Sequence, residues 1–278
     1  MQDRGWMGVG TSMRLRDLFR REAAFTVVFV HIPKTGGTSL REVLLRQYPA
    51  RRAFWIVDPV KDSAWLASLP EEDRARLRLV EGHMYYGVHE LLPRPCVYMT
   101  MLREPVERVL SYYSHIRSRE DHFLHETARD LSLGACIERG LTVELDNFMV
   151  RALSSLGHVN VPVGGVTRGM LEEAKAHLEG MVVGLTERFE ESLAMFAARL
   201  GWRRAAAGRA NVSASRVRRE QLARSELEAV EACNALDAEL YAYGRELFEA
   251  QRLGALADPG TTKNPGLVTG VLQTVRGR

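Results

Sequence analysis

A lysine, two adjacent glycines and two hydroxyl side chains lie together at residues 34–39, where an apolar run gives way to a stretch with helical spacing. Paired glycines let backbone N–H groups turn toward a ligand, and the beginning of a helix adds a partial positive charge. Lys34 adds a full positive charge, and Thr38 and Ser39 offer hydroxyl groups. These residue types predict a loop that holds a phosphate or sulfate group.

The loop differs from a Walker A motif in the position of its lysine. A Walker A loop has its lysine after the last glycine, whereas Lys34 precedes Gly36 and Gly37. A later apolar run, residues 97–102, leads into Arg103 and not into an acidic residue that could hold magnesium. The sequence therefore indicates a phosphate-like ligand bound without a metal ion, which disfavours ATP hydrolysis.

A strand and a helix are needed to position this loop. Residues 25–30 form the near-continuous apolar and β-branched run of a strand buried in a parallel sheet. After the loop, Leu40, Val43 and Leu44 follow helical spacing. The sequence predicts further strands over residues 53–57, 77–81, 96–102 and 181–185. It predicts helices over residues 38–47, 62–67, 70–76, 104–119 and 187–200, two helices within 131–156, and a long helical segment over 220–251.

This alternation of strands and helices predicts an α/β fold: one P-loop-like domain of three layers, with a central, mostly parallel sheet flanked by helices. In such sheets the loops at the carboxyl ends of the strands form the ligand crevice. Three of the predicted strand ends carry Lys34, His83 and Arg103. We therefore expect these three side chains to lie in one crevice.

Length and composition favour one soluble domain. The chain has 278 residues, of which 46% are apolar and 26% charged, and its net charge of +3 is too small to indicate a nucleic-acid partner. We expect the domain to span residues 25–257, between an N-terminal extension (1–24) and a disordered tail (258–278).

The beginning of the chain contains no apolar run of signal or membrane length, which predicts a cytoplasmic protein without a membrane span. Its three cysteines are widely spaced, so neither a disulfide framework nor a zinc site is expected.

Three segments together resemble a known family: VFVHIPKTGGTSL at residues 28–40, EGHMYYGVH at 81–89, and MLREPVERVLSYY at 101–113. They resemble the sulfotransferases that use 3′-phosphoadenosine 5′-phosphosulfate (PAPS), in particular the carbohydrate type that includes heparan sulfate 2-O-sulfotransferase. Only four of the 38 basic residues are lysine, which favours a bacterial member.

The resemblance implies a role for each matched residue. Arg103 and Ser111 would bind the 3′-phosphate, and His83 would be the base that accepts a proton from the acceptor hydroxyl. Lys34, with Thr38 or Ser39, would stabilise the leaving phosphate oxygen, and PAP would be the product. The 5′-phosphosulfate loop would comprise Lys34, Thr35, Gly36, Gly37, Thr38 and Ser39.

One departure concerns the base. The heparan sulfate 2-O enzyme has a second histidine two residues before the matched one, and this chain has Glu81. Glu81 and His83 share a face if they lie on a strand, so Glu81 would either orient the imidazole or act as the base itself.

Several alternatives remain open at this point. Asn147 and Arg151 would either reach the acceptor or cap and pair within the helical region. The basic residues 203–219 would form either a solvated loop or a lid over an anionic ligand. A sugar, a lipid or another metabolite would each supply an acceptor hydroxyl. A small-molecule kinase and a non-catalytic nucleotide-binding module are the alternative functions.

Overall fold

The computed structural model describes residues 25–202 and 217–257 of the chain. The predicted N-terminal extension, most of the basic stretch 203–219 and the predicted C-terminal tail lie outside the described residues. The expectations about them stay predictions.

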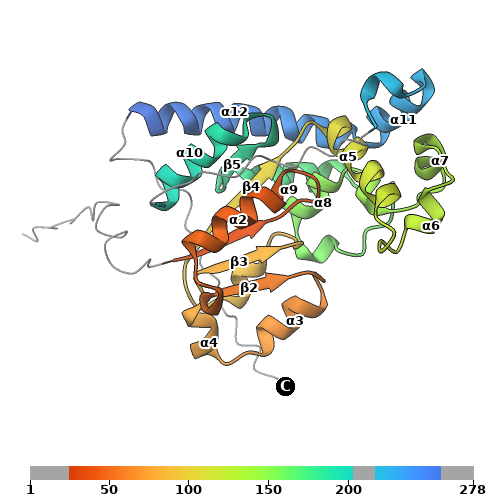
Figure 1. The fold of residues 1–278 in the computed structure, drawn as a ribbon. Helices are drawn as coiled ribbons and strands as arrows, with labels where there is room; N and C mark the ends of the chain where they lie inside the picture. Colours follow the sequence, from red (N-terminus) through yellow and green to blue (C-terminus); the bar gives the residue numbers. More distant parts are fainter. Residues whose placement is uncertain (1–24, 203–216, 258–278) are drawn as a thin grey trace, which may run out of the picture.

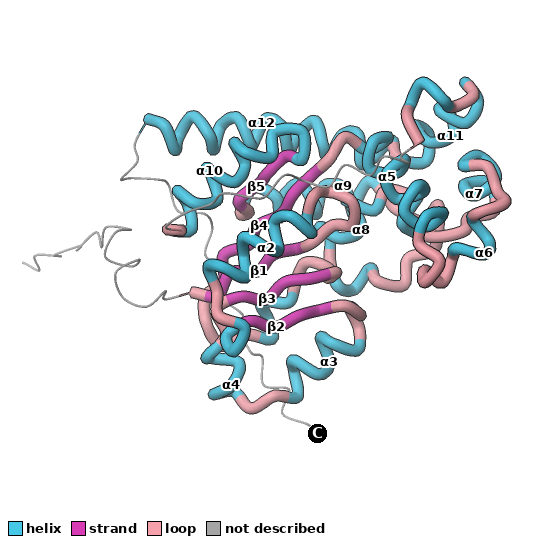
Figure 2. Tube along the Cα trace, in the orientation of Figure 1, coloured by secondary structure: helices cyan, strands magenta, loops and turns pink. Residues whose placement is uncertain are grey.

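A single five-stranded sheet forms the centre of the molecule, as predicted (Figure 2). All four pairings between neighbouring strands are parallel, in the order β2-β3-β1-β4-β5. The strands are β1 (Thr26–Val30), β2 (Ala53–Ile56), β3 (Leu79–Gly82), β4 (Cys96–Leu102) and β5 (Val182–Leu185).

The apolar runs form the two central strands because both of their faces are covered. Every residue of β1 and β4 is buried. In the register of the sheet, Phe29 pairs with Glu81 and with Met99, while Val28 pairs with Val80 and with Tyr98. Side chains alternate between the two faces along a strand, so Glu81 and Tyr98 point to opposite sides of the sheet.

Helices pack on both faces of the sheet. Figure 1 shows α2 in front of the strands and α8 and α9 behind them. The helices are α2 (Gly37–Gln47), α3 (Lys61–Ser68), α4 (Glu71–Arg76), α5 (Pro105–Ser118), α6 (His125–Ala128), α7 (Leu133–Glu138), α8 (Phe148–Ser154), α9 (Arg168–Glu179), α10 (Phe189–Leu200), α11 (Arg224–Cys233) and α12 (Ala235–Ala257).

Three helical features differ from the predictions, one of them the short helix α6, which was not predicted. The long segment predicted over residues 220–251 is divided at Asn234, whose side-chain amide donates to the carbonyl groups of Leu145 and Val230. Helix α9 was not predicted, although Thr167 at its beginning accepts the N–H of Met170, as an N-cap residue does.

Helix α12 packs closely along the β4–β5 side of the sheet. The Gln251 side chain bonds to the N–H of Val183 and the carbonyl of Met181 at the edge strand β5. A Cβ atom added to Gly244 would lie 2.3 Å from Cδ1 of Leu102, the last residue of β4. This glycine therefore lets α12 approach the strand that leads into Arg103.

Among the helices that the structure describes, none combines the length and the apolar content needed to cross a membrane.

Candidate active site

The loop between β1 and α2 has an unusual backbone conformation at Lys34. Its φ of 69° lies in the left-handed region, which is uncommon for a residue other than glycine. A guanidinium N–H of Arg103, at the end of β4, donates to the Lys34 carbonyl oxygen at 2.8 Å. Two residues that the sequence placed at separate strand ends are thus in direct contact. The left-handed turn at Lys34 itself had no signal in the sequence.

The local geometry requires glycine at both positions 36 and 37. Gly36 has a φ of 84°, where a side chain would be strained. A Cβ atom added to Gly37 would lie 1.9 Å from Nε2 of His31. The imidazole of His31 therefore occupies the space that any larger residue would need at the beginning of α2.

The beginning of α2 is suited to an anion. Its N-cap residue, Gly36, provides no side-chain hydrogen bond, and the first turn contains no acidic residue. In α5, by contrast, the carboxylate of Glu104 accepts the N–H of Glu107. The first N–H groups of an α-helix have no partner within the helix and bind phosphate or sulfate readily. Thr38 is exposed and Ser39 half-buried at this end.

The side chain of Thr35 serves the loop itself. It is fully buried, and its hydroxyl donates to the Ile32 carbonyl at 2.8 Å. The Thr35 carbonyl in turn accepts from the hydroxyl of Thr186, which also lies 3.0 Å from the Leu102 carbonyl. A ligand contact by Thr35 would therefore use its backbone N–H.

One face of α5 begins four residues after Arg103. Glu107, Ser111 and His115 are spaced by four residues and so lie on the same side of the helix, and Arg103 directly precedes the N-cap residue Glu104. The Arg103 guanidinium is 4.0 Å from the Glu107 carboxylate, and Ser111 is half-buried. Burial, followed by the positive charge of Lys34, lowers the pKa of His115 to about 4. The hydrogen bond from Arg103 to the Lys34 carbonyl brings the beginning of α5 to the loop.

His83 follows β3 and lies against His31. Gly82 has a φ of 137°, and the N–H of His83 donates to the Ile56 carbonyl at 2.8 Å. The rings of His83 and His31 stack, with centroids 4.7 Å apart and planes 25° apart. His83 retains exposed surface. Partial desolvation nevertheless lowers its pKa, while hydrogen bonding to the backbone of His31 opposes this effect.

Glu81 lies on the same side of the sheet as α2 but is fully buried. Neither of its carboxylate oxygens has a hydrogen-bond partner among the described residues. Nε of Arg41 is 4.0 Å away, and the Arg41 guanidinium carbon is 3.0 Å from the centroid of the Trp55 ring. Burial raises the pKa of Glu81 to about 7, against the opposing charge of Arg41. His83 is thus the member of this pair that a ligand can reach.

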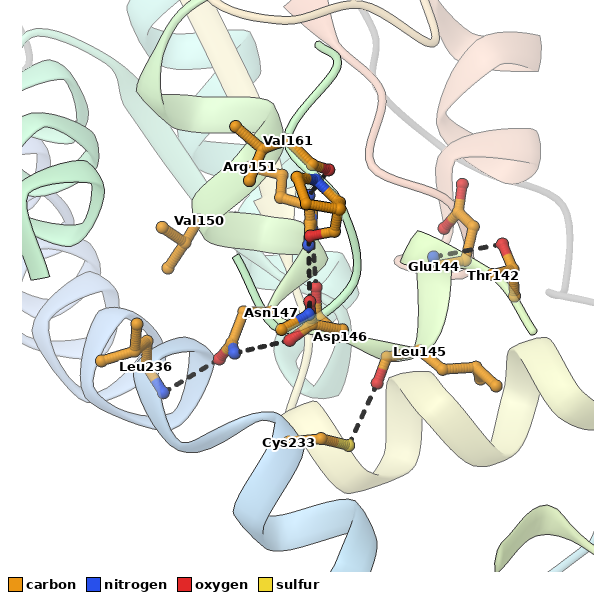
Figure 3. Close-up of polar contacts among 12 residues, drawn as sticks. Thr142, Glu144, Leu145, Asp146, Asn147, Val150, Arg151, Val161, Cys233 and Leu236 are labelled. Carbon is orange, nitrogen blue, oxygen red and sulfur yellow. Dashed lines mark hydrogen bonds and ion pairs between the residues drawn. The ribbon is translucent and has the colours of Figure 1, made fainter. Parts of the chain in front are cut away.

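Asn147 and Arg151 make structural contacts (Figure 3). The Asn147 side-chain oxygen accepts the N–H groups of Leu236 and Asp237, at the beginning of α12. The Arg151 guanidinium pairs with Asp146 and donates to the carbonyl groups of two loop residues, Val161 and Pro162. Of the two alternatives for these residues, the contacts favour capping and pairing.

The sheet order also favours a ligand site at the Lys34 loop. The chain leaves β1 toward β2 on one side and leaves β4 toward β5 on the other. Ligands bind in parallel sheets at the point where neighbouring strands connect in opposite directions. The Lys34 loop and Arg103 lie at that point. No group of three or more metal-ligating side chains occurs within residues 25–202 and 217–257.

Comparison with known proteins gives related sequences. The chain matches no family model. It is 27% identical over 279 residues to heparan-sulfate 6-O-sulfotransferase 1 of Homo sapiens, covering 80% of this chain and 65% of that protein. The Mus musculus enzyme of the same name is 26% identical and heparan-sulfate 6-O-sulfotransferase 2 of Gallus gallus 25%, each over 80% of this chain.

The chain spans about two thirds of the length of these curated relatives. The similarity supports the predicted relation to the sulfotransferases. The more specific likeness to the 2-O type, and the bacterial source, stay predictions.

Proposed function

We propose that this chain is a PAPS-dependent sulfotransferase that moves a sulfuryl group to a hydroxyl of a carbohydrate acceptor. The observation that carries the proposal is the hydrogen bond from Arg103 to the Lys34 loop. This loop leads into the N-terminus of α2, which has no side-chain cap. His31 lies between that N-terminus and His83. The names of the similar proteins support sulfuryl transfer and a carbohydrate acceptor.

The residues present fit a donor with two phosphate groups. The N–H groups at the beginning of α2, Lys34, and the hydroxyls of Thr38 and Ser39 would hold the 5′-phosphosulfate. Arg103 and Ser111 would hold the 3′-phosphate, because a guanidinium presents several N–H donors in one plane. The donor supplies the activated sulfuryl group when it is bound.

The chain itself would supply the base and the charge stabilisation. At neutral pH the lowered pKa of His83 keeps its imidazole unprotonated, so it can take the proton of the acceptor hydroxyl as the new sulfur–oxygen bond forms. The ammonium group of Lys34 would stabilise the negative charge that develops on the leaving phosphate oxygen.

Binding of PAP, ADP and ATP tests the proposed donor site. We expect calorimetry to show tight PAP binding without magnesium and weaker ADP binding. Arg103→Ala should weaken PAP binding about tenfold to a hundredfold, the usual effect of losing a hydrogen bond to a charged group. Arg168→Ala is the control, because this exposed arginine pairs with Glu239 at the surface. Equal affinities for PAP and ADP, or tighter binding of ATP with magnesium, would reject the proposal in favour of a kinase.

Sulfate transfer from PAPS to carbohydrate acceptors tests the base. His83→Ala should lower kcat by about 10²- to 10⁴-fold, the usual contribution of a general base. Its affinity for PAP should stay within about twofold of the wild-type value, because the residue faces the acceptor. A wild-type protein that binds PAP but transfers no sulfate to any hydroxyl acceptor would be a binding module.

A further inference from the structure

We propose that His31 is a positioning residue, which links the Lys34 loop to the imidazole of His83. The proposal rests on the proposed function, because it takes His83 as the base. Three observations support it: the stacking of His31 on two other rings, its close approach to Gly37, and the charged groups around the His31 ring.

The stack of rings extends from the core to the surface. The Phe29 and His31 rings are nearly parallel, with centroids 5.4 Å apart and planes 11° apart. His31 in turn stacks on His83. Phe29 is fully buried, His31 half-buried and His83 exposed. The exposed imidazole of His83 therefore packs against the His31 ring, which in turn packs against Phe29 in the core. This packing restricts the orientations of the His83 ring.

The same imidazole lies against the beginning of α2. The three atoms closest to a Cβ placed on Gly37 are all ring atoms of His31, at 1.9, 2.1 and 2.6 Å. Gly37 is the first residue of α2, and its N–H belongs to the proposed phosphosulfate site. A shift of Gly37 on ligand binding would displace the His31 ring. The His83 ring, which stacks on His31, would then move as well.

The charges around His31 keep its ring neutral. Burial lowers the pKa of His31 to about 3, with further contributions from His83, Arg41 and Lys34. Lys34 is in the loop, Arg41 is on α2, and His83 follows β3, where Glu81 lies two residues earlier. A neutral ring does not repel His83 when His83 takes up a proton. The stack therefore persists through the proton transfer.

Histidine NMR on the full chain tests this link. The probe is PAP, and the signals are the imidazole C–H resonances, with His83 assigned from His83→Ala. In the wild type, PAP should shift the His83 signal together with that of His31. In His31→Ala, the PAP-induced shift of His83 should disappear. Without nucleotide, the titration midpoint of His83 in this variant should rise by about one pH unit, because water enters the space of the lost ring.

Kinetics separate positioning from a purely structural role. His31→Ala should lower kcat about tenfold to a hundredfold and leave the acceptor KM within about threefold. Added imidazole should restore part of kcat by filling the space of the missing ring. His158→Ala is the matched control, because this half-buried histidine contacts Ser154 and Glu173 on α8 and α9.

The proposal is overturned if PAP binds the wild type without moving the His83 signal, a result that needs no folded variant. It is also overturned if His31→Ala lowers only the melting temperature and leaves the His83 titration and kcat unchanged. If the wild type does not bind PAP, the proposed function fails instead. The nucleotide-free titration of His83 would still decide whether the His31 ring positions it.

Discussion

The carboxylate of Glu81 is the polar group of the site with the least compensation. It is buried beside a cation 4.0 Å away and has no hydrogen-bond donor among the described residues. A buried charge without donors costs stability, so the proton is retained to higher pH. The sequence predicted that Glu81 and His83 share a face if both lie on a strand, but β3 ends at Gly82 and His83 lies beyond it. The sequence could not show the burial, because that depends on α2 covering this face.

Replacing Glu81 by glutamine should change how stability depends on pH. The pKa of Glu81 is raised from 4.5 to about 7, so between these values the folded protein binds more protons than the unfolded chain. Stability due to this group is therefore highest below pH 4.5 and falls as the pH rises toward 7. Glu81→Gln should remove that fall, so that its stability gains about 3 kcal/mol on the wild type as the pH rises from 4.5 to 8.

Urea unfolding at several pH values measures this difference. Glu42→Gln, an exposed change on α2, is the control. Parallel stability curves for the wild type and Glu81→Gln would show that the carboxylate is stabilised by contacts other than those described.

At the scale of elements, a buried ion pair joins Arg151 of α8 to Asp146, which lies two residues before that helix. Both Arg151 and Asp146 are almost fully buried, and Asp146 also accepts the N–H of Gly164. The sequence predicted that Asn147 and Arg151 belong to one helical region. Their partners could not be predicted, because Val161, Pro162 and the beginning of α12 lie outside that helical region.

Breaking this pair should lower stability and spare the donor site. Arg151→Ala should reduce the free energy of unfolding by about 3–5 kcal/mol, because it leaves a buried carboxylate unpaired. Arg168→Ala breaks the exposed pair with Glu239 and should cost at most about 1 kcal/mol. Chemical denaturation gives both values, and calorimetry should show unchanged PAP affinity for the folded variants. An Arg151→Ala protein of normal stability and raised acceptor KM would instead favour the acceptor role.

Helix α9 illustrates the limits of reading elements from sequence. Its buried residues Met170, Leu171, Ala174 and Leu178 do follow helical spacing, and Thr167 marks its beginning. The neighbouring glycine- and valine-rich segment, 157–167, had no regular pattern and obscured this boundary. Strand β4, in contrast, was predicted with its observed bounds, because its seven residues are all buried and a proline precedes them.

At the scale of the whole molecule, alternation of strands and helices was sufficient to predict one parallel sheet flanked by helices. Apolar periodicity encodes that level of structure directly. The strand order and the left-handed backbone of Lys34 were not predictable in the same way. Both depend on packing between distant segments, such as the hydrogen bond from Arg103 to the loop.

The packing of α12 on β4 leads to a prediction at this scale. Gly244→Ala would place a methyl group 2.3 Å from a Leu102 side chain that is itself fully buried. Such overpacking typically costs about 1–3 kcal/mol. Because Leu102 directly precedes Arg103, PAP affinity should fall along with the melting temperature. Gly169→Ala, in the first turn of α9, is the control. Loss of stability with unchanged PAP affinity would show that β4 absorbs the strain before Arg103.

The close approach of Gly244 to Leu102 also affects how inactivating mutations in this chain would be interpreted. A genetic screen for inactive variants should recover Gly244 beside Arg103, although the two residues are far apart in sequence and only one of them is proposed to touch a ligand. A map of tolerated substitutions would then assign part of α12 to the active site. The contribution of this helix, however, is to hold β4 in place.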